Sequence, residues 1–239
     1  MKLYNRMMCI ITILSAISTT VFATDRHLET GAYLTTTTVL DDSFEFFSDD
    51  TMVLDSWGLD VRAELWNVNG TLHLLPVVSY RYANVGGSPH LPAGLMNTSL
   101  ILNEVDAGLR GRVWFLPWLG GFAQLQTGIS HIAMEGVINN AGQEGMYNKY
   151  RDKDVEWNIG ALMGLEIRIS PWRMERAHID WLNIGAEIGV GFIKRTEANF
   201  SPTLKGGDEL SLTNIQTVDF GNIDLSGIVF QAGLTASFL

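Results

Sequence analysis

Charged residues recur at every second position in several stretches of this chain, a spacing that could support ionic chemistry. Successive residues of a β-strand point to opposite faces, so residues two apart share one face. Charges gathered on one face either pair with each other, as buried charges must, or line a path for ions. We expect a packed ionic core and keep a narrow pore as the alternative. The core set is Arg62, Glu64, Arg110, Arg112, Glu166, Arg168 and Glu187. Asp60, His73, Arg81, Glu104 and Asp106 fall on the same face.

Hydrolytic chemistry would require a nucleophile beside a base, and Ser130-His131 is the adjacent pair that could supply them. Neighbouring strand residues face opposite sides, so these two side chains cannot act together. His131 and Glu135 could form a base and its orienting carboxylate, but we expect no outward-facing serine beside them. Gly-x-Ser-x-Gly, paired metal-binding histidines and a phosphate loop are absent. We therefore predict no catalytic residue, no cofactor and no metal site.

An acidic segment follows the first alternating stretch. It carries six acids and no base within fifteen residues: Asp41, Asp42, Glu45, Asp49, Asp50 and Asp55. Oxygen-rich loops can hold calcium, but the Asp-x-Asp-x-Asp-Gly spacing is missing. We expect these acids to be solvated, with divalent ions that bridge them to lipid phosphates as the alternative.

The elements that must position the charges are eight stretches in which apolar and polar residues alternate. They cover residues 28–40, 57–66, 72–82, 104–115, 121–130, 155–169, 182–192 and 225–238. Period-two alternation is typical of strands. The facing of the first stretch is ambiguous because of its four threonines, residues 35–38. Each apolar face runs uncharged for about six outward positions, roughly what a hydrocarbon band of ~25 Å requires.

Two short connections set the expected pairing. Asn-Gly between alternating runs is the strongest short hairpin signal, and with these as the two turn residues Val68 pairs with Thr71. In the next hairpin a three-residue loop, 117–119, would place Arg112 opposite Gln124. Both hairpins keep the charged faces on one side of the sheet.

Alternation alone cannot separate a membrane barrel from a soluble lipocalin-like barrel, but two further features favour the membrane. Short connections at 67–70 and 116–119 alternate with long ones at 41–56, 84–102, 133–154 and 194–224, as in outer-membrane barrels. Aromatic residues also cluster near the strand ends, as in the two aromatic girdles of such barrels. They are Trp57, Tyr80, Tyr82, Trp157 and Phe192 at the external end, and Phe115 and Phe238 at the other.

The N-terminus reads as an export signal. Lys2 and Arg6 precede an apolar run, and Val21-Phe22-Ala23 forms a cleavage signature, so residues 1–23 are a predicted signal peptide and 24–239 a single barrel domain. Cleavage removes Cys9, the only cysteine, and leaves 14 basic against 26 acidic residues. The resulting net charge of −12 argues against a nucleic-acid partner.

The signal, the eight strands and the final strand ending Gly233-Leu234-Thr235-Ala236-Ser237-Phe238-Leu239 resemble the small OmpA-like and OmpX-like outer-membrane barrels. The resemblance implies a monomer in the bacterial outer membrane, surrounded by lipid and lipopolysaccharide. It also implies recognition of the last strand, through Phe238, by the barrel-assembly machinery. The connection from Ser170 to Asp180 is longer than usual for a periplasmic turn.

These observations predict an all-β, eight-stranded antiparallel up-and-down transmembrane β-barrel. We expect a non-enzymatic protein whose four external loops serve envelope integrity, adhesion or surface recognition. The alternatives are a lipid-modifying enzyme that resembles lipid A deacylases or acyltransferases, and a narrow, porin-like pore.

Overall fold

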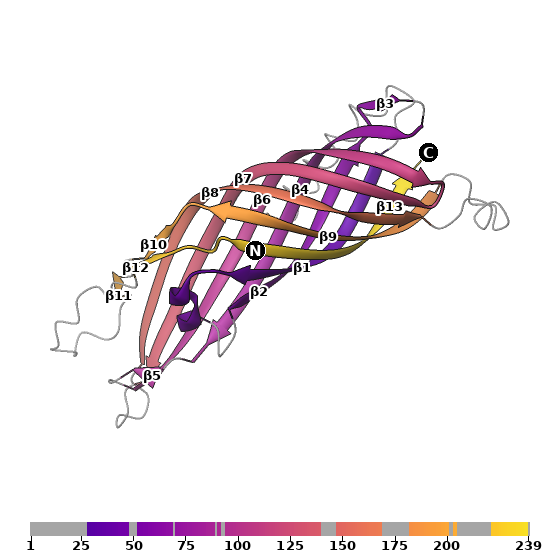
Figure 1. The fold of residues 1–239 in the computed structure, drawn as a ribbon. Coiled ribbons are helices and arrows are strands. Elements are labelled where there is room, and N and C mark those ends of the chain that lie inside the picture. Colours follow the sequence, from indigo (N-terminus) through magenta and orange to yellow (C-terminus); the bar gives the residue numbers. More distant parts are fainter. Residues whose placement is uncertain are drawn as a thin grey trace.

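Eight long antiparallel strands form a closed ring in the computed structural model of the chain (Figure 1). The structure describes residues 28–47, 52–68, 70–88, 90–91, 94–139, 147–168, 182–200, 203–204 and 221–238. The predicted signal peptide, 1–23, and the connection 170–180 lie outside these residues. No helix in the described ranges is long and apolar enough to cross a membrane.

Each long strand pairs with the next one in the chain. The strands are β1 (Leu28–Val39), β2 (Val53–Ala63), β4 (Leu72–Gly87), β6 (Gly94–Leu116), β7 (Leu119–Asn139), β8 (Tyr147–Arg168), β9 (Leu182–Arg195) and β13 (Gly227–Phe238). β1 pairs with β13 over twelve residue pairs, from Leu28 with Phe238 to Val39 with Gly227, and this pairing closes the ring. The all-β, up-and-down, eight-stranded barrel predicted from the sequence is confirmed.

Burial alternates along the strands as the pattern predicts, with charged and small residues inside and apolar residues outside. On β9, for example, Ile188 is 62% exposed while its neighbour Glu187 is 3% exposed. The ambiguous first strand turns its odd positions inward, so Thr35 and Thr37 are buried and Leu34 faces out. Apolar exteriors of this kind belong in lipid, and every ladder bond is satisfied within the closed ring.

The register of the first hairpin differs at the turn from the expected one. Val68, in the short strand β3 (Trp66–Val68), pairs with Leu72 instead of Thr71. Gly70 adopts a φ of 69°, which a non-glycine residue rarely adopts, and so permits a longer loop. An irregularity between β2 and β3 absorbs the extra residue, and Trp57 pairs with Tyr82 in the barrel as expected. The two faces are therefore preserved.

The register of the second hairpin was predicted wrongly. Arg112 lies opposite Phe122, and Gln124 lies opposite Arg110. Residues 117–118 form the tight turn, and the pairing shifts between Trp114 and Leu116, so the loop is shorter than the expected three residues. A shift of two residues keeps every side chain on its predicted face, because the side-chain period is two.

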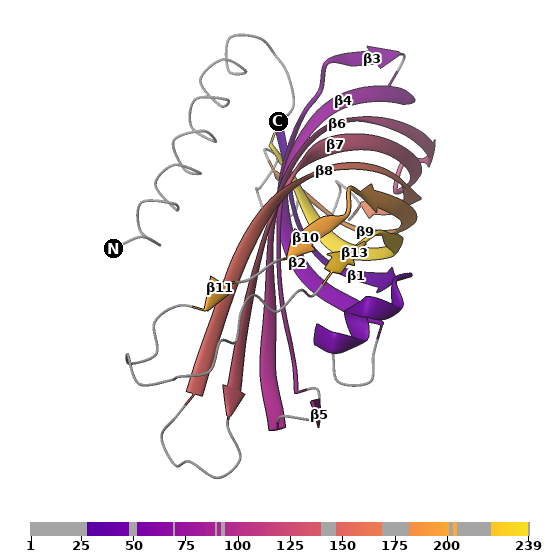
Figure 2. The same cartoon turned by 90° about the vertical axis from the view of Figure 1, so that its left-hand side faces the viewer.

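Strands β6, β7 and β8 continue furthest past the ring, and β4 accompanies β6 as far as Gly87 with Thr98. β6 and β7 pair as far as Met96 with Ile138, and β7 and β8 as far as Asn139 with Tyr147. By contrast, β8 and β9 pair only from Asn158 with Arg195 onward. Figure 2 shows these three strands projecting beyond the barrel wall. The expectation that 84–102 and 133–154 are external loops is thus wrong, because both are largely strand; we call this three-stranded extension the projection.

An apolar core closes the end of the barrel from which the projection rises. It is built from strand ends, the 3-10 helix η1 (Asp42–Phe47) and the small β10–β12 sheet (Ala198–Phe200 with Gly221–Ile223). We call it the apolar cap: Val39, Phe44, Phe47, Leu54, Ala83, Leu100, Leu102, Ile132, Met134, Ala198, Phe200, Ile223 and Leu225. Two further short strands are β5 (His90–Leu91), which pairs with β6, and β11 (Thr203–Leu204), which pairs with the edge of β8.

Phe44→Ala should lower the free energy of unfolding by about 3–5 kcal/mol, because the fully buried ring would leave a cavity in the apolar cap. The measurement is chemical unfolding of the protein in detergent micelles, followed by tryptophan fluorescence. Phe115→Ala is the control, since that ring is 62% exposed on the barrel exterior and should cost less. Equal losses would contradict a densely packed cap.

Candidate functional site

The lumen near the hairpin turns holds an ionic cluster of four arginines and four carboxylates, which we call the lower cluster. Its members are Glu29, Asp60, Arg62, Arg110, Arg112, Glu166, Arg168 and Glu187. They come from β1, β2, β6, β8 and β9 and converge because each occupies an inward position of its strand. The formal charges cancel, which is the condition under which charged groups remain buried.

Glu187 binds several other side chains of the lumen at once. Its carboxylate accepts a hydrogen bond from Arg62 Nη1 at 2.9 Å and one from Arg110 Nη2 at 2.7 Å. Gln231 Nε2 donates to the same carboxylate at 2.8 Å. Arg62 also reaches Asp60 at 2.6 Å. This single carboxylate therefore joins side chains from β2, β6, β9 and β13 across the barrel.

Arg112 forms the second junction of the lower cluster. It makes a two-pronged contact with Glu29, with nitrogen–oxygen distances of 2.6 and 2.5 Å, and its Nε lies 2.8 Å from Glu166. Arg168 approaches Glu29 at 3.6 Å and lies over the Trp114 ring, 3.9 Å from its centroid. Paired forks of this kind combine hydrogen bonding with Coulomb attraction.

A second group of charges, the upper cluster, lies between the lower cluster and the apolar cap: Arg81, Glu104, Asp106 and Arg195. Glu104 is contacted by Arg81 at 3.2 Å and by Arg195 Nη2 at 2.8 Å. Arg195 Nη1 also donates to the carbonyl oxygen of Leu225, in the cap, at 2.5 Å. Two arginines again balance two carboxylates.

The structure brings six of the seven predicted core residues into the lower cluster and sets Glu64 apart. Glu64 lies at the turn end of the lumen, where its Oε2 is 3.2 Å from His73 Nδ1. Sequence reasoning missed Glu29, because the threonine run hid the facing of its strand. It also missed Arg195, which it assigned to an external connection. The alternation continuing from Phe192 through Ile193 to Arg195 was the signal that could have found it.

Aromatic rings fill lumen space that the charges leave. Phe122, which sequence reasoning did not single out, lies beneath Arg110, with the guanidinium carbon 3.5 Å from the ring centroid. Tyr33 covers Gly58, where a Cβ atom would fall 2.3 Å from the ring. A larger residue at position 58 would have to displace the buried Tyr33 ring. A cavity beside Arg81, Gln126 and Gln231 has a volume of about 10 Å³, room for about one water molecule.

The predicted girdle residues lie on the exterior. Trp57 packs against Tyr80 and Tyr82, with ring centroids 5.9 and 5.7 Å apart. Trp157 and Phe192 are exposed towards the cap end of the barrel. Phe115 and Phe238 are exposed towards the turn end, 62% and 37% respectively.

The candidate catalytic pair is split between the two faces of β7. Ser130 is fully buried, and its hydroxyl donates to Glu104 at 3.1 Å. His131 points outward, opposite Asn103 on β6 and Val155 on β8. Glu135 lies four residues along the same face and is ion-paired with Arg151. Ser99 on β6 also faces outward and pairs in register with Glu135, so the expectation that no outward-facing serine lies beside His131 and Glu135 is wrong.

Two carboxylates, one after β1 and one within β8, bind backbone N–H groups of the segments that form the apolar cap. Asp41 Oδ2 accepts from the backbone N–H of Asp224 at 2.7 Å, and Asp154 Oδ2 accepts from that of Asn199 at 2.9 Å. Burial would raise the pKa of Asp224, but hydrogen bonds from Lys194 and Ser226 outweigh it and hold that pKa below its usual value. Of the acidic segment, Asp55 accepts from Thr36 Oγ1 at 2.8 Å. No group of His, Asp or Glu suited to a metal ion occurs in the described residues.

The fold and the lumen together define a small transmembrane β-barrel with a filled interior. Two charge-balanced clusters and the apolar cap occupy the space along the barrel axis. The lumen side chains therefore bind one another. An eight-stranded ring is just wide enough for such filling.

Solved structures with which the chain was matched are small outer-membrane barrels, the class that the sequence resembles. Neisserial surface protein A aligns at 8% identity over 90% of this chain and 97% of its own, with a TM-score of 0.43. Ail, the attachment invasion locus protein of Yersinia pestis, in complex with the heparin analogue sucrose octasulfate, aligns at 12% identity over 89% and 97%, with a TM-score of 0.38. The N-terminal β-barrel domain of Pseudomonas aeruginosa OprF aligns at 14% identity over 89% and 96%, with a TM-score of 0.28.

No protein-family model and no curated protein sequence matches the chain. At TM-scores below 0.5 the matched structures add no functional argument. The strand pairing described above defines the fold.

Arg110→Ala should lower the free energy of unfolding by about 3–5 kcal/mol, because it leaves Glu187 and Glu166 short of a buried partner. Arg151→Ala is the matched control on the exterior, where the arginine side chain is 42% exposed, and should cost less than about 1 kcal/mol. The measurement is urea unfolding of the protein reconstituted in lipid vesicles. Equal costs would mean that the lumen hydrates an unpaired carboxylate.

Proposed function

We propose that the protein is a non-enzymatic, monomeric barrel of the bacterial outer membrane that presents its projection and cap to the cell surroundings for surface recognition or adhesion. The observation that carries this proposal is a reversal of sidedness along β6 and β7. In the barrel these strands carry charge inside and apolar residues outside; beyond the girdle the arrangement is inverted.

The reversal is visible residue by residue. Inward positions of β6 change from Asp106 and Glu104 to Leu102 and Leu100, all of them buried. Outward positions change from apolar ones such as Leu109 and Val105 to polar ones such as Ser99 and Asn97. A lipid-facing segment needs an apolar exterior, whereas a water-exposed segment needs an apolar interior. We infer that the membrane ends near the row of Trp57, Tyr82 and His131 and that the projection stands in water.

The filled lumen argues against the porin-like alternative. An ion would have to displace paired guanidinium and carboxylate groups, which is costly in a low dielectric, and would then meet the apolar cap. The charge pairs join strands on opposite sides of the barrel, which supports a role for them in stabilising the fold.

The remaining partners follow from the same placement. Lipid and lipopolysaccharide would surround the apolar exterior. The barrel-assembly machinery would act on β13, whose pairing with β1 completes the ring. We include a role in envelope integrity in this proposal, because a closed ring spans the membrane without unpaired strand edges.

Replacing residues 136–150 by Asn-Gly should abolish attachment of expressing bacteria to host cells or matrix, because it removes the β7–β8 part of the projection. Barrel assembly should persist, since Glu135 and Arg151 are already paired and can flank a tight turn. The measurements are counted attachment of whole cells and the gel-mobility shift between unboiled and boiled protein. Deleting 172–179, within the connection between Arg168 and Leu182, is the control and should leave attachment intact. Retained attachment after the β7–β8 truncation would contradict the proposal.

Wild-type protein should give no step-like ion currents in planar bilayers, because charge pairs and the apolar cap block the axis. In bacteria that express the protein, the mass spectrum of lipid A should be the same with wild type and with His131→Ala. Steady conductance that rises in Arg110→Ala would favour the pore, and a lipid A mass change lost in His131→Ala would favour the enzyme.

A further inference from the structure

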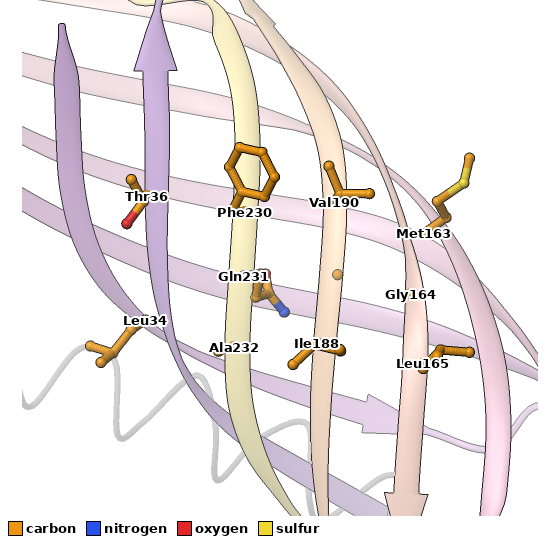
Figure 3. Close-up of a pocket in the computed structure, with 11 residues that line it drawn as sticks. Leu34, Thr36, Met163, Gly164, Leu165, Ile188, Val190, Phe230, Gln231 and Ala232 are labelled. Atoms are coloured by element: carbon orange, nitrogen blue, oxygen red, sulfur yellow. The ribbon is translucent and has the colours of Figure 1, made fainter.

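A groove crosses the apolar exterior of the barrel over β1, β13, β9 and β8 and has a volume of about 490 Å³. Figure 3 shows that two rows of outward side chains border it: Thr36, Phe230, Val190 and Met163 along one side, and Leu34, Ala232, Ile188 and Leu165 along the other. The strand register aligns each row, since Phe230 pairs with Val190 and Ala232 with Ile188. The small side chain of Ala232 leaves the groove open at its centre.

Positive charge on the exterior gathers on two of the strands that line this groove. Among residues whose side chains the structure describes, the other arginines belong to the lumen clusters. Arg151, Lys153 and Lys194 are the bases that face outward, from β8 and β9. Arg151 is ion-paired with Glu135, and Lys194 Nζ lies 2.5 Å from Asp224 Oδ2. The chain as a whole carries a net charge of −10, and these three are the outward-facing Lys and Arg residues whose side chains the structure describes.

Lys194 lies on β9 beyond the groove, towards the cap end of the barrel. It is the next outward residue after Phe192 on β9, and Val190 and Ile188 follow on the same face. Ile188 lies six residues from Lys194, ~20 Å along the strand and ~14 Å in depth for a strand tilted by about 45°. One leaflet of a bilayer has a hydrocarbon depth of ~15 Å. An acyl chain whose head group contacts Lys194 can therefore reach the groove.

We propose that this face is a binding site for one outer-leaflet lipid A molecule, with a phosphate at Lys194 and an acyl chain in the groove. The inference rests on the outer-membrane placement proposed above and names the lipid partner of that surface. The negative phosphate complements a lysine in an otherwise acidic chain, and the apolar lining complements the acyl chain.

Asp224 does not block the phosphate. Its carboxylate also accepts the backbone N–H of Ser226 at 2.9 Å, so it keeps a partner when Lys194 turns towards lipid. The Lys194 side chain is 54% exposed and has room to turn. Long basic side chains commonly extend to the interface in this way.

The test is native mass spectrometry of the full barrel in detergent, titrated with bisphosphorylated lipid A. Lys194→Gln should raise the dissociation constant about fivefold, since an exposed charge contact is lost. Ala232→Phe, which fills the groove, should raise it about threefold through lost packing. Ala232→Leu repeats that test should the larger residue impair folding, and the boiling-dependent gel shift verifies the barrel in each variant.

Matched controls separate the site from general adsorption. Lys153→Gln removes an outward lysine about 20 Å along β8 from the residue paired with Lys194, and should change the constant less than about twofold. Ala107→Phe adds the same ring on β6, four strands around the eight-stranded ring from β13. Dephosphorylated lipid A should bind wild type as weakly as lipid A binds Lys194→Gln.

Equal losses with Lys153→Gln and Lys194→Gln would overturn the proposal in favour of diffuse surface charge. Equal losses with Ala107→Phe and Ala232→Phe would overturn it in favour of a nonspecific apolar belt, and equal affinity for phosphatidylglycerol would overturn the assignment to lipid A. These outcomes concern β9 and β13, whereas the attachment experiment concerns β7 and β8. The lipid site and surface recognition can therefore fail separately.

Discussion

The shared carboxylate of Glu187 is the interaction on which the barrel interior depends. Two arginines from different strands and Gln231 converge on it, so four strands are joined through one residue. Arg62, Arg110 and Arg112 are fully buried in the narrow ring, so each must find its opposite charge inside. The lower cluster meets this demand with four carboxylates for four guanidinium groups, and the upper cluster with two for two. Glycine at position 58 and the rings of Tyr33 and Phe122 then complete the filling.

The apolar cap solves the complementary problem at the other end. In the part of the strands that continues beyond the ionic clusters, the interior is apolar instead of charged. The chain places leucine, isoleucine and phenylalanine inside and polar residues outside, as a water-soluble β-protein does. η1 and the β10–β12 sheet supply the apolar side chains that the strands alone could not gather. Arg195 connects the upper cluster to the apolar cap, since it binds Glu104 in the cluster and the backbone carbonyl of Leu225 in the cap.

Much of this architecture is predictable from alternation, because a two-residue period fixes which face each side chain occupies. Arg62, Arg110 and Glu187 were placed in the lumen on that basis alone. Register is less accessible: Arg112 was matched with Gln124, yet a two-residue turn and an irregularity near Trp114 bring Phe122 opposite it. The partners of each charge also escape sequence reasoning, since Arg62 and Glu187 are 125 positions apart. The projection was mistaken for loops because the expected strand length was set by the membrane, while pairing continues beyond it.

Closure between β1 and β13 carries a consequence for how the molecule forms. The first and last strands are separated by almost the whole chain, so their contact has the largest loop-closure cost of any pairing in the ring. Until they meet, the nascent sheet has two unpaired edges and exposes its charged face, a state prone to aggregation. Substitutions along this seam should therefore reduce the yield of assembled protein by slowing the final step, even where the finished barrel tolerates them.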